Sequence, residues 1–316
     1  VTEHIPEEQV IMFMINCANL AMDKTNSPFK NTYTVFTKDL REKLKQETII
    51  STQLKPALEN NEFKLWFQPQ YSTATGEIAG TETLCRWIKP DGEIITPSVF
   101  IPIAEKNGFI RNLDEAIWKM AFQTMRKWLD KGYSPVPLSV NISRISLTSD
   151  ALIYYIARLK TEYNMPVELI HFEVTESAYM SEQTELVERI QKIRELGFQV
   201  AMDDFGSGYS SLNSLKDIPI DILKLDMGFL RSSQNLEKGG CILNSVIKMA
   251  QALEFITIAE GVETESQANF LKSLGCDIIQ GFLYARPMPE KDYEKLIKTK
   301  EKHVLVRKPN ILGKIS

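Results

Sequence analysis

The chain has 316 residues, of which 43% are hydrophobic and 25% are charged, and its formal net charge is −4 at pH 7. These values are typical of a folded globular protein, and they exclude collagen-like, low-complexity and wholly disordered chains. The slight negative charge and the lack of a basic run exclude broad binding to the backbone of a DNA or RNA polymer. A compact phosphate ligand held by a few cations is still compatible with this composition.

The cysteines indicate a reducing compartment. The four of them, Cys17, Cys85, Cys241 and Cys276, lie far apart and in no metal-binding spacing. We therefore expect neither a disulfide framework nor a structural zinc, and we expect a cytoplasmic location. No signal peptide or membrane-spanning run is evident. Because the sequence begins at Val1 without a methionine, we expect a fragment, and the full-length protein could carry a membrane anchor or sensory domain elsewhere.

The first fifty residues are predicted to contain two helices with a break and a short strand between them. Apolar spacing predicts a helix over residues 10–22, and Asn26, Ser27 and Pro28 then break the pattern. Residues 33–36 fit a short strand, and residues 38–45 predict a charged, solvated helix. This segment could be an N-terminal cap or linker, or it could be the remnant of a preceding domain.

From residue 61 onward, short β-rich runs alternate with amphipathic helical stretches. The strands are predicted at residues 62–70, 78–87, 137–142, 169–175, 198–203, 222–226, 255–259 and 277–283. The helices between them are predicted at residues 113–131, 151–163, 184–196, 240–253 and 264–274. Such alternation predicts βα units and a largely parallel sheet.

The number of strands favours one architecture. About eight strands over roughly 240 residues match a TIM-type barrel. Only residues 72–77 join the first two strands, too few for a helical crossover, so these two strands should pair antiparallel. We therefore predict an α/β fold, a modified TIM (β/α)8 barrel with an antiparallel first strand. A doubly wound sheet is the alternative, but Gln68-Pro69-Gln70 stands where its glycine-rich phosphate loop would be expected.

Polar residues stand at the end of nearly every predicted strand. In chain order they are Gln68, Glu82, Asn141, Glu173, Asp203, Asp204, Lys224, Glu260 and Gln280. The carboxyl ends of barrel strands meet on one face, where active sites lie. Crowded carboxylates repel one another when ionised, and oxygen ligands favour hard cations such as Mg²⁺ or Mn²⁺. Each residue alone could be a helix cap, a turn or an internal ion pair. Their shared position favours a metal-dependent active site, in which two ions could cleave a phosphodiester.

Several motifs resemble those of a known family. Glu82-Thr83-Leu84, followed by Cys85-Arg86-Trp87, is similar to the signature of the EAL-domain cyclic di-GMP phosphodiesterases. The other motifs follow in order: Gln68-Pro69, VNIS at 140–143, EVTES at 173–177, DDFGSGYSSL at 203–212, KLD at 224–226, AEGVE at 259–263, QGF at 280–282 and ARP at 285–287. The resemblance covers roughly residues 55–297.

The resemblance implies hydrolysis of cyclic di-GMP to linear pGpG with two Mg²⁺ or Mn²⁺ ions, by a homodimer in bacterial second-messenger signalling. It assigns the metal ions to Glu82, Asn141, Glu173, Asp203, Asp204 and Glu260. Catalytic roles fall to Glu82, Lys224, Glu260 and Gln280, and the general base could be Lys224, Glu260 or the metal ions alone. Substrate contacts fall to Gln68, Arg86, Asp226, Glu263 and Pro287, while Glu176 and Ser207 would support the loop after Asp204.

The head of the chain carries a second resemblance. Residues 19–24 and 31–36 are similar to the last helix and strand of a GGDEF domain, without its signature loop. We therefore predict that residues 1–50 are a C-terminal GGDEF remnant plus a linker helix, and that residues 51–316 form the phosphodiesterase barrel.

Two departures from the family pattern stand near the predicted site. Thr83 replaces the alanine of the signature and adds a hydroxyl group there. The loop at 88–92 is one residue shorter than usual and lacks a histidine, which puts ligand affinity in question. Neither change removes a metal ligand. The alternative to an active enzyme is a weak or inactive cyclic di-GMP receptor, or a scaffold.

Overall fold

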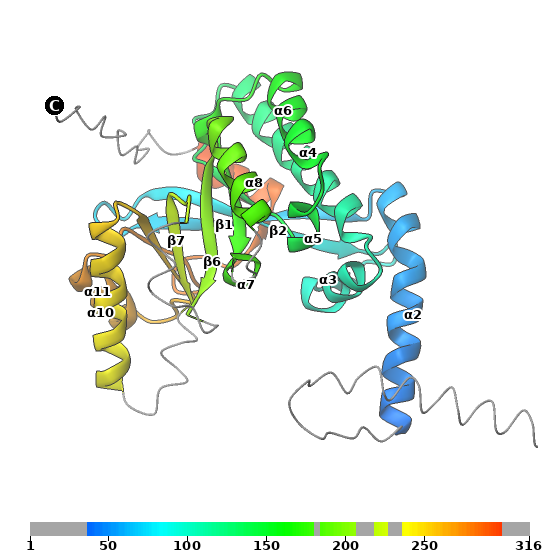
Figure 1. Ribbon diagram of the computed structural model, residues 1–316, viewed down its shortest axis with the longest axis horizontal. Coiled ribbons are helices and arrows are strands. Elements are labelled where there is room, and N and C mark those ends of the chain that lie inside the picture. Colours follow the sequence, from blue (N-terminus) through cyan, green and yellow to red (C-terminus); the bar gives the residue numbers. More distant parts are fainter. Residues whose placement is uncertain (1–36, 180–183, 207–217, 227–235, 299–316) are drawn as a thin grey trace, which may run out of the picture.

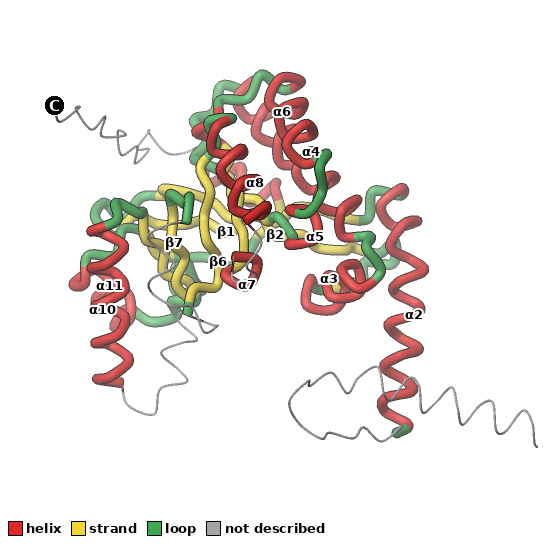
Figure 2. The backbone as a smooth tube through the Cα atoms, viewed as in Figure 1, coloured by secondary structure: helices red, strands yellow, loops and turns green. Residues whose placement is uncertain are grey.

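The computed structural model describes residues 37–179, 184–206, 218–226 and 236–298. Its centre is a closed barrel of strands surrounded by helices (Figures 1 and 2). The strands are β1 (Phe63–Ser72), β2 (Ile78–Ile88), β3 (Ile94–Ile95), β4 (Leu138–Asn141), β5 (Ile170–Thr175), β6 (Gln199–Phe205), β7 (Ile222–Asp226), β8 (Ile256–Glu260), β9 (Ile278–Ile279) and β10 (Met288–Pro289). The predicted helix at 10–22, the strand at 33–36 and the GGDEF-like residues lie outside the described residues.

The strand order confirms the predicted fold class. β2 pairs antiparallel with β1, and β2, β4, β5, β6, β7, β8 and β9 then pair in parallel order. β9 pairs antiparallel with β1, which closes the barrel. β3 and β10 are two-residue additions that pair with β2 and β1. The chain is therefore a TIM-type barrel whose first strand runs the opposite way, because residues 73–77 are too few for a helical crossover.

Helices cover the outside of the barrel. They are α2 (Lys38–Glu59), α3 (Pro97–Lys106), α4 (Ile110–Asp130), α5 (Arg144–Leu147), α6 (Leu152–Glu162), the 3₁₀ turn η1 (Val167–Leu169), α7 (Glu176–Tyr179), α8 (Thr184–Glu195), α10 (Leu236–Ala252), α11 (Glu265–Leu274) and α12 (Glu290–Lys298). In Figure 1, α4, α6 and α8 lie together on one side of the strands, and α10 and α11 lie on another. No helix in the described ranges is long and apolar enough to cross a bilayer.

The first described helix is longer than predicted. The charged segment at 38–45 is only the beginning of α2, which continues to Glu59. Ile50, Leu54 and Ala57 are buried in its second half, where the helix packs on the body of the protein, and the first half is largely exposed. The domain boundary predicted after residue 50 falls inside this helix, and the division itself stays a prediction.

The predicted strand at 277–283 is wrong beyond its third residue. β9 ends at Ile279 because the chain then turns toward the end of β8. The Val262 amide donates to Gln280 O at 3.1 Å, and the Leu283 amide donates to Val262 O at 3.1 Å. A Cβ atom at Gly281 would collide with the Val262 backbone, so only glycine allows this close approach. The turn leaves Gln280 just beyond the strand, beside the end of β8.

A cluster of aromatic side chains holds the barrel closed next to β1. Phe67 of β1, Trp128 of α4 and Tyr293 of α12 have ring centroids 5.3–5.4 Å apart. All three are fully buried. Aromatic rings bury large areas and prefer such offset contacts, so this cluster fixes α4 and α12 against the strand that closes the barrel.

Candidate active site

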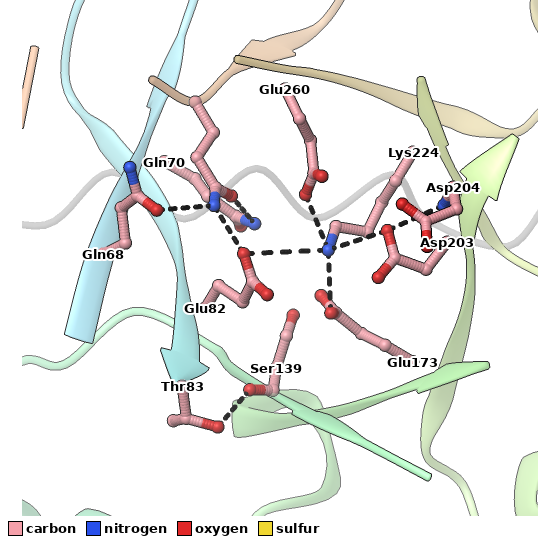
Figure 3. A network of polar contacts seen from close by, with 11 residues as sticks. Gln68, Gln70, Glu82, Thr83, Ser139, Glu173, Asp203, Asp204, Lys224 and Glu260 are labelled. Atoms are coloured by element: carbon pink, nitrogen blue, oxygen red, sulfur yellow. Dashed lines mark hydrogen bonds and ion pairs between the residues drawn. The ribbon is translucent and has the colours of Figure 1, made fainter. Parts of the chain in front are cut away.

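The polar ends of the strands converge on one buried lysine (Figure 3). Lys224 of β7 is fully buried. Its Nζ lies 2.6 Å from Glu260 Oε1, 2.8 Å from Glu173 Oε2, 3.1 Å from Asp203 Oδ1 and 3.8 Å from Glu82 Oε2. The four carboxylates come from β8, β5, β6 and β2. The barrel therefore brings together side chains that are far apart in the sequence, although Glu82 and Lys224 lie within β2 and β7 rather than at the ends of these strands.

The cluster carries more negative than positive charge, since one ammonium faces four carboxyl groups. Burial alone would lower the pKa of Lys224, but the surrounding carboxylates raise this pKa well above its ordinary value. Lys224 is consequently a cation at neutral pH. Burial raises the pKa of Glu173 and of Glu260, and the nearby acidic groups add to the effect, while Lys224 opposes it. Such perturbed carboxyl groups at the end of a barrel are typical of functional sites.

One carboxylate oxygen at the centre is unused. Within the described part of the chain, Glu173 Oε1 is buried and has no hydrogen-bond partner. A buried charged oxygen without a partner is costly, and a cation would satisfy it. The carboxylate oxygens that the described residues bring together here suit Mg²⁺ or Mn²⁺. The acidic side chains now surround Lys224, and no three or more His, Cys, Asp or Glu side chains of the described ranges stand close enough to share one ion.

Two consecutive aspartates reach the same cluster. In a regular strand Asp203 and Asp204 would point to opposite faces. Asp204 instead has a left-handed backbone with φ 58°, and the register between β6 and β7 shifts at this point. The Asp204 amide donates to Asp203 Oδ1 at 2.9 Å. Figure 3 shows both carboxylates on the side that faces Lys224. The irregular strand end therefore delivers two acidic groups where a regular strand would deliver one.

A network of amides lines the other side of the cluster. Gln280 Nε2 donates to Glu82 Oε2 at 2.5 Å and to Gln68 Oε1 at 3.1 Å. Gln70 Nε2 donates to Gln280 Oε1 at 2.8 Å. The absence of a side chain at Gly80 leaves room for the Gln70 amide. These bonds fix the Glu82 carboxylate in the orientation from which it faces Lys224.

Arg86 lies on the same strand as Glu82, four residues further toward the strand's end. Its guanidinium is 5.5 Å from the ring centroid of Trp66, and its Nη1 donates to the carbonyl of Cys85 at 2.9 Å. Trp66 is on β1 opposite Leu84, and its contact with Arg86 crosses the β1–β2 pair. A cation over an aromatic face is held without a counter-ion. The arrangement leaves the guanidinium available to an anionic ligand.

The remaining predicted residues stand at or after the ends of strands, and Glu176 begins α7. Asn141 ends β4 and pairs in register with Glu173, and Asp226 ends β7 and pairs with Glu260. Glu176 Oε2 accepts a hydrogen bond from the Gly206 amide at 2.8 Å, which ties the start of the following loop to α7. Glu263 and Pro287 lie in the segments after β8 and before β10. Ser207 lies outside the described residues.

Sequence reasoning missed several residues that shape the site. Gln70 could have been found, because it is two residues from Gln68 and therefore on the same face of β1. Trp66 follows from the same periodicity. Asp114 and Trp118 of α4 could not be found in this way, since their contacts with the end of β4 depend on how the helix packs.

The chain is similar to known proteins over most of its length. The family model described as "EAL domain" matches residues 51–287. The chain is 38% identical over 255 residues to "Signaling protein YkoW" of Bacillus subtilis, covering 81% of this chain and 31% of that protein. It is 36% identical over 236 residues to "Cyclic di-GMP phosphodiesterase RocR" of Pseudomonas aeruginosa, covering 75% of this chain and 60% of that protein.

A solved structure shows the same fold. The structure described as "PaMucR Phosphodiesterase, c-di-GMP complex" superposes with a TM-score of 0.73 at 34% identity, covering 78% of this chain and 99% of that one. The curated relatives named above are longer proteins, and the chain spans 31% of the length of one and 60% of the other.

Proposed function

Since the chain belongs to the EAL domain family, whose model matches residues 51–287, we propose that it hydrolyses cyclic di-GMP to linear pGpG. One water cleaves one of the two phosphodiester bonds of the ring and leaves a linear dinucleotide. The observation that carries this proposal is the cluster of Glu82, Glu173, Asp203 and Glu260 around Lys224 at the mouth of the barrel. Relatives and a solved structure that are named for cyclic di-GMP support the choice of substrate.

We propose two divalent cations, Mg²⁺ or Mn²⁺, as cofactors. Glu82, Asn141, Glu173 and Asp203 would hold one ion, and Asp203, Asp204 and Glu260 would hold the other. Bound there, such ions supply Lewis-acid stabilisation of the reacting phosphate and make water a better nucleophile. The unpartnered Glu173 Oε1 and the surplus of buried carboxylates support this assignment.

Side chains of the chain itself would stabilise negative charge in the site and position the attacking water. Lys224 stays protonated because its pKa is raised, so it would stabilise negative charge rather than accept a proton. With Lys224 protonated, the proton of the attacking water would pass to Glu260 or leave with the help of the metal ions alone. Gln280 would hold Glu82 and the attacking water in place, as its bonds to Glu82 and Gln68 suggest.

Substrate binding would involve the residues around the mouth of the barrel. Arg86 would form two parallel hydrogen bonds to a phosphate of the ligand, a geometry that guanidinium groups favour. Gln68, Asp226, Glu263 and Pro287 would contact the rest of the nucleotide, and Glu176 with Ser207 would support the loop after Asp204. We also propose that the protein acts in the cytoplasm and forms a homodimer. GGDEF or sensory domains would lie upstream in the full-length protein.

The test is chromatography of cyclic di-GMP incubated with the protein in Mg²⁺, in Mn²⁺ and in EDTA. We expect a pGpG peak in either metal ion and intact nucleotide in EDTA. Intact nucleotide under all three conditions would refute the enzyme. Tight equilibrium binding in that case would indicate a cyclic di-GMP receptor, and no binding at all would indicate a scaffold.

A further inference from the structure

Strand β4, which ends at Asn141, has little strand pairing on one of its edges. It has only four residues, and its pairing with β2 is limited to Thr81↔Leu138 and Glu82↔Ser139. Beyond Glu82, β2 no longer pairs with β4, and near its end Trp87 and Ile88 pair with β3 instead. On its other edge β4 pairs with β5 along its whole length, and the Ile142 amide continues the ladder by donating to Glu173 O at 2.8 Å. The backbone groups of β4 that face away from β5 therefore need other partners.

Three side chains supply those partners. Thr83 Oγ1 donates to Ser139 O at 2.6 Å, as Figure 3 shows. Trp118 Nε1 donates to Asn141 O at 2.9 Å. Asp114 Oδ2 accepts from the Ser143 amide at 3.0 Å and from Ser146 Oγ at 2.6 Å. Alternate residues of a strand direct their backbone groups to the same edge, so residues 139, 141 and 143 are bonded along the one edge that β2 leaves.

All three side chains are buried and rigidly placed. Thr83 is 3% exposed, Asp114 is 4% exposed and Trp118 is 1% exposed. Asp114 and Trp118 are four residues apart on α4, so they lie on one face of that helix, the face turned to β4. Thr83 follows Glu82 directly, so its bond also joins the strand of Glu82 to the strand of Asn141.

We propose that Thr83, Trp118 and Asp114 are positioning residues for Asn141: their hydrogen bonds fix the unpaired edge of β4 and so place the Asn141 amide beside Glu82 and Glu173. The proposal rests on the proposed function, because it takes Asn141 to be a metal ligand. Groups that orient a metal ligand usually affect metal affinity by about 10–100-fold. Thr83, which stands where the family signature has alanine, is the member that can be tested with the least disturbance.

The experiment compares Thr83→Val with Thr83→Ser. Valine keeps the shape of threonine and removes the hydroxyl, whereas serine keeps the hydroxyl and removes the methyl group. Mn²⁺ affinity is titrated through the electron paramagnetic resonance signal of the free ion, and hydrogen exchange of the peptide spanning residues 138–143 is followed by mass spectrometry. We expect Thr83→Val to bind Mn²⁺ about 10-fold more weakly and to exchange faster in this peptide. Thr83→Ser should resemble the wild type in both measurements.

The matched control is Thr257→Val on β8. Thr257 is also a buried barrel threonine, and its hydroxyl bonds Asp277, at the opposite end of its strand from Glu260. It should lose thermal stability without losing Mn²⁺ affinity. Equal Mn²⁺ affinity in Thr83→Val and the wild type would overturn the proposal, even if hydrogen exchange changed, because Thr83 would then serve stability alone. This outcome differs from failure of the proposed function, which is the absence of pGpG from the wild-type protein.

Discussion

The barrel buries carboxyl groups in two different kinds of surroundings. Asp114 of α4 is 4% exposed and accepts hydrogen bonds from Ser143 and Ser146, which are neutral groups. Glu173 of β5 is fully buried beside the Lys224 ammonium, with other carboxylates nearby and one oxygen unpartnered in the described structure. Burial raises the pKa of both groups, to about 6 for Asp114 and to about 8 for Glu173. The same physical cause therefore acts at both places.

The two sites differ in whether the protein itself supplies partners for the buried carboxyl groups. The Asp114 oxygen that accepts both bonds has its partners within the protein, and the bonds hold the end of β4. The cluster around Lys224 crowds four carboxyl groups around one ammonium, and the raised pKa values of Glu173 and Glu260 show that negative charge is held there at a cost. Buried charges cost free energy unless they are paired, so a cluster that keeps them is evidence for a ligand that the fold alone does not provide. The three predictions below test this contrast, from the largest expected effect to the smallest.

Removing the central cation should have the largest effect. Lys224→Met keeps a long unbranched side chain but leaves Glu82, Glu173, Asp203 and Glu260 without a counter-ion. Breaking a buried ion pair by removing one partner costs about 3–5 kcal/mol, and we expect a loss of that order in EDTA at pH 7. Mg²⁺ or Mn²⁺ should restore more stability to the variant than to the wild type, as measured by thermal unfolding with and without metal ion.

The control for this variant is Lys160→Met. Lys160 donates a single hydrogen bond to Leu196 O at 2.7 Å, away from the acidic cluster. It should cost about 1 kcal/mol, with no dependence on metal ion. Equal stability of Lys224→Met and the wild type in EDTA would show that the carboxyl groups are already neutral, and the contrast with Asp114 would then disappear.

Removing one acidic group of the cluster should separate function from stability. In Asp203→Asn the amide oxygen can still accept from the Asp204 amide, but one negative charge is lost. Turnover should fall by more than about 100-fold, the upper value for residues that only support metal ligands. The melting temperature should stay the same or rise, because a crowded group of like charges loses one member. Product chromatography and thermal unfolding measure the two effects.

Asp221→Asn is the matched control for a carboxylate that stabilises the fold. Asp221 pairs with Arg194 at 2.8 Å and accepts from the Val200 amide at 2.9 Å, just before β7. This variant should lose stability and keep its turnover per folded molecule. If Asp203→Asn behaved in the same way, its carboxylate would be a structural group rather than a metal ligand.

Much of the fold could be predicted because it depends on local patterns. Alternating strands and helices, and the short connection at 72–77, were enough to predict a barrel with an antiparallel first strand. The strand predicted at 277–283 was too long, because a hydrogen bond from the Val262 amide to Gln280 O turns the chain after Ile279. These two residues are not neighbours in the sequence. The helix α2 was underestimated because its charged beginning gives no sign of the buried Ile50 and Leu54 that continue it.

The residues of the site also fall into those that local patterns predict and those that depend on long-range packing. Residues at strand ends, such as Asn141 and Glu260, could be grouped from sequence because parallel strands bring their carboxyl ends together. The left-handed backbone of Asp204 and the contacts of Asp114 with the end of β4 depend on packing between distant segments. No periodicity encodes such contacts, so sequence reasoning could not find them.

The smallest effect is expected at Asp114, and it should depend on pH in a specific direction. Burial raises its pKa to about 6 in the folded protein, above the ordinary aspartate value near 3.8, while bonds from Ser146 and Ser143 oppose the shift and Glu105 adds to it. A raised carboxyl pKa contributes stability that is complete below the unfolded pKa and is lost as the pH rises through about 6. Asp114→Asn has no such titration, since asparagine accepts the same bonds without a charge.

The free energy of unfolding of Asp114→Asn, relative to the wild type, should therefore be larger at pH 8 than at pH 5 by about 1.4 kcal/mol, which means that the variant is relatively more stable at pH 8. Denaturant unfolding of both proteins across this range measures the difference, and any fixed cost of the new amide group cancels. A relative stability of Asp114→Asn that rises as the pH falls would mean that the Asp114 site favours the charged form. Neutral hydrogen-bond donors would then suffice to hold a buried charge, and the surplus charge around Lys224 would no longer indicate a missing cation.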